Sequence, residues 1–87
     1  MRVLSAFVGN HEIAVYNNWW NGVETVKYDG ATVSSQFSWF GSVHAFSVEE
    51  AGEVARYEVE VSLSLNGISA NIWRNEQPVV LGLPRRA

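Results

Sequence analysis

Two histidines are the side chains in this sequence best suited to acid–base or metal chemistry. His11 and His44 lie far apart in the chain, and neither has a partner ligand at the spacing of a metal motif. His44 alternates with Phe46 and Val48, which is typical of a histidine on the buried face of a strand. We therefore expect His44 to be structural, and we expect no metal ion and no other cofactor.

Serines and paired acids are the remaining candidates for catalysis. No serine lies in a strained Gly-x-Ser-x-Gly turn, and no glycine run could cradle a phosphate. The pair Glu49-Glu50 is typical of a solvated turn, and Glu58 and Glu60 are typical of a solvent-facing strand. The sequence therefore predicts that the protein is not an enzyme. One alternative stays open, an enzyme that uses His44 with a nearby carboxylate, and it requires a pocket around His44.

The elements that must position these side chains are short β-strands. Turn signals recur at Asn21-Gly22, Asp29-Gly30, Glu50-Ala51-Gly52, Asn66-Gly67 and Arg74-Asn75-Glu76. Runs rich in β-branched and aromatic residues predict strands over 4–8, 12–19, 23–28, 32–39, 43–48, 55–65, 68–74 and 79–81. A helix over 47–55 is disfavoured by Gly52 and by its short length. The fold class is all-β: a small antiparallel sandwich, or a partly open barrel, of about seven or eight strands built from sequential hairpins.

Length and composition limit the chain to a single domain, residues 1–87. Of its residues 47% are hydrophobic and 13% aromatic, which is enough for one modest core. The absence of cysteine excludes disulfides and thiolate chemistry. The net charge of −3 argues against a nucleic-acid partner. The first apolar run is too short for a signal peptide or a membrane span, so we expect a cytoplasmic protein without membrane insertion.

Tight turns also predict which side chains share a face. A two-residue turn at Asn66-Gly67 places Val61 opposite Ile72 on the buried face. The same turn places Glu60 opposite Trp73 on the outer face.

A second turn, at Asp29-Gly30, predicts a hairpin of the same kind. It pairs Tyr28 with Ala31 and Val26 with Val33 on the buried face.

Outward-facing aromatic residues form the candidate binding surface. Extending the hairpin through Asn21-Gly22 places Trp19 inside, and Tyr16 and Trp20 outside, unless a one-residue bulge inverts the faces. Exposed aromatic rings flanked by amides could stack on a sugar, a base or a partner's side chains, although rings that simply cover a sheet edge are the commoner case. The candidate site residues are Tyr16, Asn18, Trp20, Glu60, Asn71 and Trp73.

Two families share parts of this pattern. The motifs Asn17-Asn18-Trp19, Asp29-Gly30, Phe-Gly-x-x-His-x-Phe over residues 40–46 and Arg74-Asn75 resemble a small uncharacterised bacterial all-β family. The segment 33–48, followed by Tyr57-Glu58-Val59 and Asn66-Gly67, resembles the β-sandwich of the Fas apoptotic inhibitory molecule proteins. The resemblance implies a sandwich and a non-enzymatic interaction domain. It transfers no binding residue, because no functional motif matches.

These observations predict a non-catalytic interaction module whose partner is a protein or a second copy of the chain. Self-association would use an exposed edge strand. Val79 and Leu81, flanked by Pro78 and Pro84, lie near such an edge, which either pairs with a second copy or is protected from pairing. The alternative function is a small-ligand binder, such as a carbohydrate module, that uses an outward aromatic face.

Overall fold

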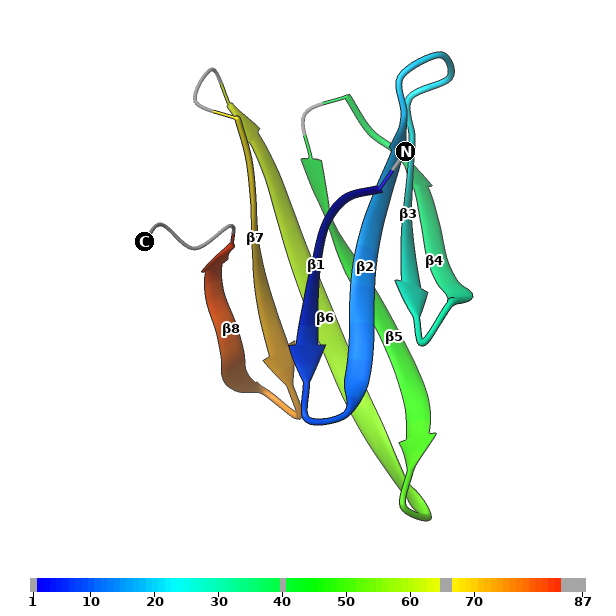
Figure 1. Cartoon of the computed structure of the whole chain (residues 1–87), viewed down its shortest axis with the longest axis vertical. Coiled ribbons are helices and arrows are strands. Elements are labelled where there is room, and N and C mark those ends of the chain that lie inside the picture. Colours follow the sequence, from blue (N-terminus) through cyan, green and yellow to red (C-terminus); the bar gives the residue numbers. More distant parts are fainter. Residues whose placement is uncertain (1, 40, 65–66, 84–87) are drawn as a thin grey trace.

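Eight β-strands make up the fold in the computed structural model, which describes residues 2–39, 41–64 and 67–83 (Figure 1). The strands are β1 (Arg2–Val8), β2 (His11–Asn18), β3 (Val23–Tyr28), β4 (Ala31–Phe37), β5 (Gly41–Glu50), β6 (Glu53–Ser64), β7 (Gly67–Arg74) and β8 (Gln77–Leu83). They form two antiparallel sheets, with strand orders β1-β2-β3-β4 and β5-β6-β7-β8. The prediction of an all-β sandwich of sequential hairpins is therefore confirmed, and the chain does not form the partly open barrel. None of the described residues belongs to a helix that could cross a membrane.

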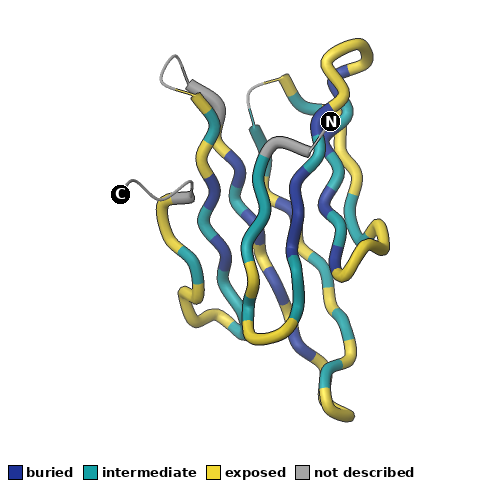
Figure 2. The backbone as a smooth tube through the Cα atoms, viewed as in Figure 1, coloured by how far each residue is buried: buried dark blue, intermediate teal, exposed yellow. Residues whose placement is uncertain are grey.

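The core lies between the two sheets, because alternate residues of each strand point inward (Figure 2). Its buried apolar side chains come from the central strands of both sheets: Ile13, Val15, Val26, Tyr28, Ala55, Tyr57, Val59, Val61 and Ile72. The edge strands add partly buried residues around this cluster. Burial of apolar surface against the opposite sheet holds the sandwich together.

The β6–β7 hairpin keeps the predicted faces but not the predicted pairs. Its last described pair is Ser64 with Gly67, and residues 65–66 between them lie outside the described residues. This register differs by two residues from the prediction, and Ile72 therefore faces Val59 and not Val61. Because side chains alternate with a period of two, a two-residue slip leaves every side chain on its predicted face. Trp73 accordingly lies on the outer face, opposite Glu58.

The β2–β3 connection is longer than a two-residue turn. Pairing ends at Asn18 with Val23, which leaves residues 19–22 as a loop. The Asn18 carbonyl accepts a hydrogen bond from Gly22 N at 2.9 Å and closes that loop. The prediction that Trp19 belongs to the inner set is therefore wrong, because its side chain leaves the sheet and is exposed.

A β-bulge reorients β4. The turn after Tyr28 pairs this residue with Ala31 as predicted, but the register then shifts, and Val26 faces Ser34 in place of Val33. The predicted pair of Val26 with Val33 is therefore wrong. The extra residue turns the Ser34 hydroxyl inward, where it reaches the opposite sheet.

Candidate binding surfaces and buried polar sites

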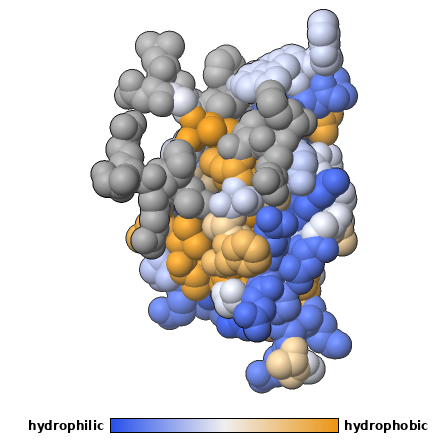
Figure 3. All heavy atoms as spheres, in the orientation of Figure 1, coloured by the Kyte–Doolittle hydropathy of each residue, from blue (hydrophilic) through white to orange (hydrophobic). Residues whose placement is uncertain are grey.

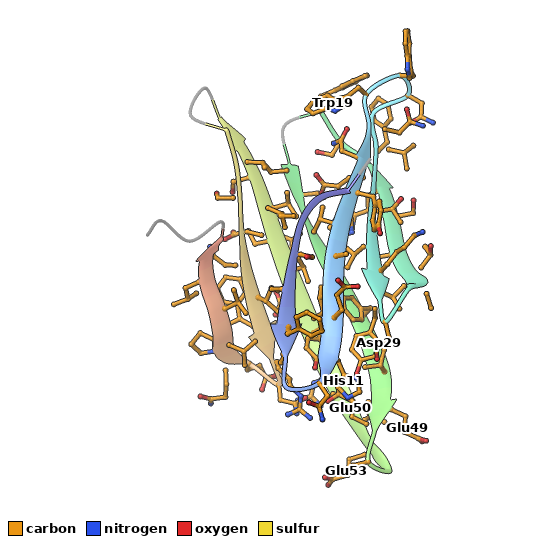
Figure 4. All side chains as sticks on the ribbon, in the orientation of Figure 1. His11, Trp19, Asp29, Glu49, Glu50 and Glu53 are labelled. Carbon is orange, nitrogen blue, oxygen red and sulfur yellow. The ribbon has the colours of Figure 1, made fainter. Side chains whose placement is uncertain are left out.

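Four large aromatic side chains gather at one end of the sandwich, and we call them the aromatic tip. Two belong to the β2–β3 loop and two to the end of β4 and the connection that follows it: Trp19 is 53% exposed, Trp20 96%, Phe37 69% and Trp39 44%. Figure 4 shows Trp19 at this end of the molecule. None of the four belongs to the buried core cluster.

Close packing between the two chain segments holds the aromatic tip together. Phe37 and Trp39 meet edge to face, with ring centroids 5.8 Å apart. Both rings cover Gly22 so closely that a Cβ there would lie 3.0 Å or less from them. Ser38 N also donates a hydrogen bond to Gly22 O at 2.7 Å. The loop and the β4–β5 connection therefore form one surface.

Uncharged polar groups surround these rings. Asn18 Oδ1 accepts a hydrogen bond from Trp20 N, and Asn21 Oδ1 accepts one from Val23 N, each at 3.0 Å. Both amide oxygens thus fix the loop backbone, while their NH2 groups donate no hydrogen bond within the described residues. Residues 19–22 and 37–39 carry no formal charge.

Charged residues concentrate at the opposite end. Figure 4 shows His11, Asp29 and Glu50 there, and hydrophilic residues dominate the lower part of the surface in Figure 3. The two ends of the sandwich thus offer contrasting chemistry.

The six predicted site residues do not share one surface. Tyr16 lies on the outer face of the first sheet, under the Lys27 ammonium at 4.7 Å from its ring centroid, while Asn18 and Trp20 lie at the aromatic tip. The other three, Glu60, Asn71 and Trp73, lie on the outer face of the second sheet. The outer faces of a sandwich point away from each other, so one ligand could not contact Tyr16 and Trp73 together. Their roles in binding remain predictions.

Trp73 lines two shallow hollows on the outer face of the second sheet. The larger has a volume of 380 Å³ and is lined by Ser47, Arg56 and Trp73 among others, and the smaller has 230 Å³. Asn71 takes a structural role beside them, since its Nδ2 donates to Glu60 Oε1 at 3.0 Å and its Oδ1 accepts from Gly82 N at 2.8 Å. Asn71 thus ties β8 to the sheet.

One end of the core contains a buried polar network that joins the two sheets. The His44 ring, from β5, lies 2.8 Å (Nε2) from Glu24 Oε1 and 2.7 Å (Nδ1) from Ser34 Oγ, and both Glu24 and His44 are 0% exposed. Ser42 Oγ donates to the same Glu24 oxygen at 2.7 Å. The prediction of a buried, satisfied histidine is therefore confirmed, and a carboxylate does contact it. A substrate could not reach His44 in this structure, because its side chain has no exposed surface.

Glu50 forms a second network at the other end. Its Oε2 accepts hydrogen bonds from Tyr28 OH of the first sheet and from Tyr57 OH at 2.6 Å. Its Oε1 accepts two from Arg74, at 3.0 Å (Nε) and 2.8 Å (Nη2). The prediction that Glu50 lies in a solvated turn is therefore wrong. Glu50 lies an even number of residues after Phe46 and Val48, and this spacing predicts the same face of the strand for all three side chains.

These contacts control protonation at the Glu50 network. Burial alone would raise the pKa of Glu50, but the hydrogen bonds from Tyr28, Tyr57 and Arg74 outweigh it and lower the pKa to about 2. Burial and the Glu50 carboxylate raise the pKa of Tyr57 to about 12, and the same causes raise the pKa of Tyr28. The network therefore holds a fixed carboxylate that neither gives nor takes a proton near neutral pH.

An open hollow of 460 Å³ adjoins this network. His11, Glu53 and Arg74 line it, and His11 stacks on Tyr28 with ring centroids 5.1 Å apart. His11 Nδ1 lies 2.7 Å from Asp29 Oδ2, and this contact, together with the Glu12 N–H, lowers the pKa of Asp29. No group of three or more His, Cys, Asp or Glu side chains in the described part of the chain could hold a metal ion.

Comparison of the chain with protein-family models, with curated proteins and with solved structures found no match. The family resemblances therefore remain predictions.

Proposed function

We propose that this chain is a non-catalytic interaction module that binds a protein partner through the aromatic tip. The exposure of four large aromatic side chains at one end, with Trp20 almost entirely in solvent, carries the proposal. Exposed apolar patches of this kind mark interaction sites in soluble proteins, and single exposed residues do not.

The composition of the aromatic tip supports a protein partner. Trp and other aromatic residues are enriched at the energetic centres of protein interfaces, while charged residues are depleted there. Both segments of the tip lack charge, and the core does not need their rings. Close packing of Phe37 and Trp39 over Gly22 also fixes part of the surface before binding, which lowers the entropy cost of association.

The two polar networks do not favour catalysis. Glu24 and His44 are fully buried, and the Glu50 carboxylate accepts four hydrogen bonds from protein groups. A general base or nucleophile must instead have a free lone pair within reach of a substrate. The Glu50 network is typical of polar groups that are satisfied within the fold. Glu24 Oε2 has no hydrogen-bond partner among the described residues, but it is buried and out of reach of a substrate.

Site-specific photo-crosslinking tests this proposal. Trp20 is replaced by p-benzoylphenylalanine, and the labelled chain is irradiated in an extract of cells that make the natural protein. Thr32, exposed at the start of β4, provides the matched control position. We expect a distinct cross-linked product from position 20 that is absent from position 32. Excess unlabelled wild-type chain should abolish this product, whereas excess unlabelled W20A should not. No product from position 20, or the same products from both positions, would refute the proposal.

A carbohydrate ligand at the same surface is the second candidate function. The NH2 groups of Asn18 and Asn21, which donate no hydrogen bond in the described part of the chain, favour it. Stacking on the exposed Trp20 ring together with amide donors suits a sugar. A glycan array probed with wild-type chain and with W20A separates the two functions. Binding of a glycan that W20A loses would support this candidate over the protein partner.

A further inference from the structure

The edge strands of the two sheets are not equally protected against pairing with another chain. Register shifts interrupt the pairing of β1 and of β4, and β8 contains Pro78 together with two register shifts. Bulges and proline are devices by which proteins prevent an edge strand from pairing with another chain. β5 is the exception: it has 10 residues, pairs with β6 without interruption, and contains no Pro, Lys or Arg.

Side chains from the β4–β5 region cover only the first part of the free edge of β5. Ser38 Oγ donates to Gly41 O, and Gln36 Nε2 donates to Val43 O at 2.9 Å. These contacts show that the backbone groups of Gly41 and Val43 point away from β6. Because orientation alternates along a strand, the next backbone groups on this edge belong to Ala45, Ser47 and Glu49. No hydrogen bond covers these three within the described residues.

The open part of the edge lies on a projecting hairpin. Figure 1 shows the β5–β6 hairpin extending beyond the turns of the first sheet. Phe46 and Val48 occupy the inner face of this stretch and are only partly buried against the core. Phe46 stacks on Tyr57 with centroids 5.3 Å apart and retains part of its surface exposed.

We propose that a second copy of the chain pairs with this edge, antiparallel, about a two-fold axis at Ser47. Ser47 then faces its own counterpart, and Ala45 faces Glu49 of the second copy through backbone hydrogen bonds. The same register places Phe46 opposite Val48 of the second copy on the inner face. An aromatic and a β-branched side chain in directly opposed positions stabilise a strand pair, and the two cores become continuous across the joint.

The charges of β5 permit this joint and favour the antiparallel direction. A parallel arrangement would align Glu49 with its own counterpart. In the antiparallel pair about Ser47, the two Glu49 residues are separated along the strands by roughly four residues, about 14 Å. That distance exceeds the Debye length of about 8 Å at physiological ionic strength, so their repulsion is screened.

The mass of the chain in solution tests the joint. Sedimentation equilibrium of the wild-type chain at tens to hundreds of micromolar should give twice the single-chain mass of 9.7 kDa. Ser47→Lys places two ammonium groups side by side on the axis and should weaken dimerisation at least about tenfold. Ser69→Lys, which adds the same charge at an exposed position of the inner strand β7, should leave the dimer intact. Single-chain mass for the wild type, or equal dimerisation of both variants, would overturn the proposal.

Cross-linking provides a second test that does not depend on how Ser47→Lys folds. The chain lacks cysteine, so Ser47→Cys supplies a unique thiol at the axis. A short bifunctional maleimide should join two such chains efficiently and should not join Ser35→Cys, an exposed position on the β4 edge. Equal cross-linking at both positions would contradict the joint. The inference is independent of the aromatic tip, since W20A should dimerise as the wild type does.

Discussion

At the scale of single residues, one glutamate joins the two sheets at each end of the apolar core, Glu24 fully buried and Glu50 partly buried. Glu24 of the first sheet meets His44 of the second, and Glu50 of the second sheet meets Tyr28 of the first. Burial of a carboxylate is costly unless hydrogen bonds and opposite charge compensate it, which is the case at Glu50. These contacts fix how the sheets align, in addition to the apolar packing between them.

Acid should destabilise the fold through Glu50. Its pKa is about 2 in the folded chain and near 4.5 when unfolded, so its contribution is complete above pH 4.5 and is lost as the pH falls toward 2. The shift corresponds to about 3 kcal/mol at most, and we expect about 1–2 kcal/mol because Arg74 is partly solvated. Urea unfolding of wild type and Glu50→Gln across this pH window measures the effect.

The neighbouring residue supplies the control for that experiment. Glu49→Gln changes an exposed acid and should leave the pH dependence of the free energy of unfolding as in the wild type. If Glu50→Gln kept the pH dependence of the wild type, the Glu50 network would not be the source of the stability that is lost in acid.

The Glu24–His44 pair should show strong energetic coupling. Glu24→Leu or His44→Leu alone leaves a polar group buried without its partner, and each should cost about 3–5 kcal/mol. The double variant should lose clearly less than the sum, because neither group is then left unpaired. A double-mutant cycle from urea unfolding measures the coupling, and additive losses would contradict it.

At the scale of elements, the alternation of side chains was predictable from sequence while the lengths of the turns were not. The loop at residues 19–22 and the pairing of Ser64 with Gly67 shift two hairpins by two residues from the predicted register. Such a shift preserves the face of each side chain, so the alternation of apolar and polar residues does not reveal it. The bulge that pairs Ser34 with Val26 could not be predicted from the sequence either, because Val33 fits the alternation as well as Ser34 does.

The candidate site was predictable only in part. The exposure of Trp20 followed from the turn, but Phe37 and Trp39 join it through a contact between segments that adjoin only in the folded chain. Glu24 carried a usable signal, because it shares parity with Val26 and Tyr28 on the buried face of β3. A lone His44 gave no indication of which acid would contact it.

Gly41 should be indispensable to the start of β5. Its φ is +108°, and a Cβ there would lie 2.2 Å from the backbone oxygen of Val61, so alanine must displace β6. Gly52, at φ +80° with nothing within 4 Å, gives the matched control. We expect Gly52→Ala to cost about 1 kcal/mol from backbone strain alone, and Gly41→Ala to cost more than about 2 kcal/mol. Chemical unfolding of both variants measures these losses, and equal losses would contradict the close approach.

At the scale of the whole molecule, the residues that stabilise the fold and the proposed binding surface occupy different places. The apolar core and both glutamate networks lie between the sheets, whereas the aromatic tip lies outside the core. A small sandwich can therefore change its recognition surface with little effect on its stability, since exposed side chains outside such networks contribute little to folding.

Solvent exposure of the four tryptophan indoles is the measurement that tests the aromatic tip most directly. A two-dimensional NMR spectrum of the indole N–H signals, assigned by single Trp→Phe variants, is recorded with and without a soluble paramagnetic agent. We predict the strongest loss of signal for Trp20, weaker loss for Trp19 and Trp39, and the best protection for Trp73, which is partly buried. Protection of Trp20 equal to that of Trp73 would contradict the exposed tip and remove the basis of the proposed function.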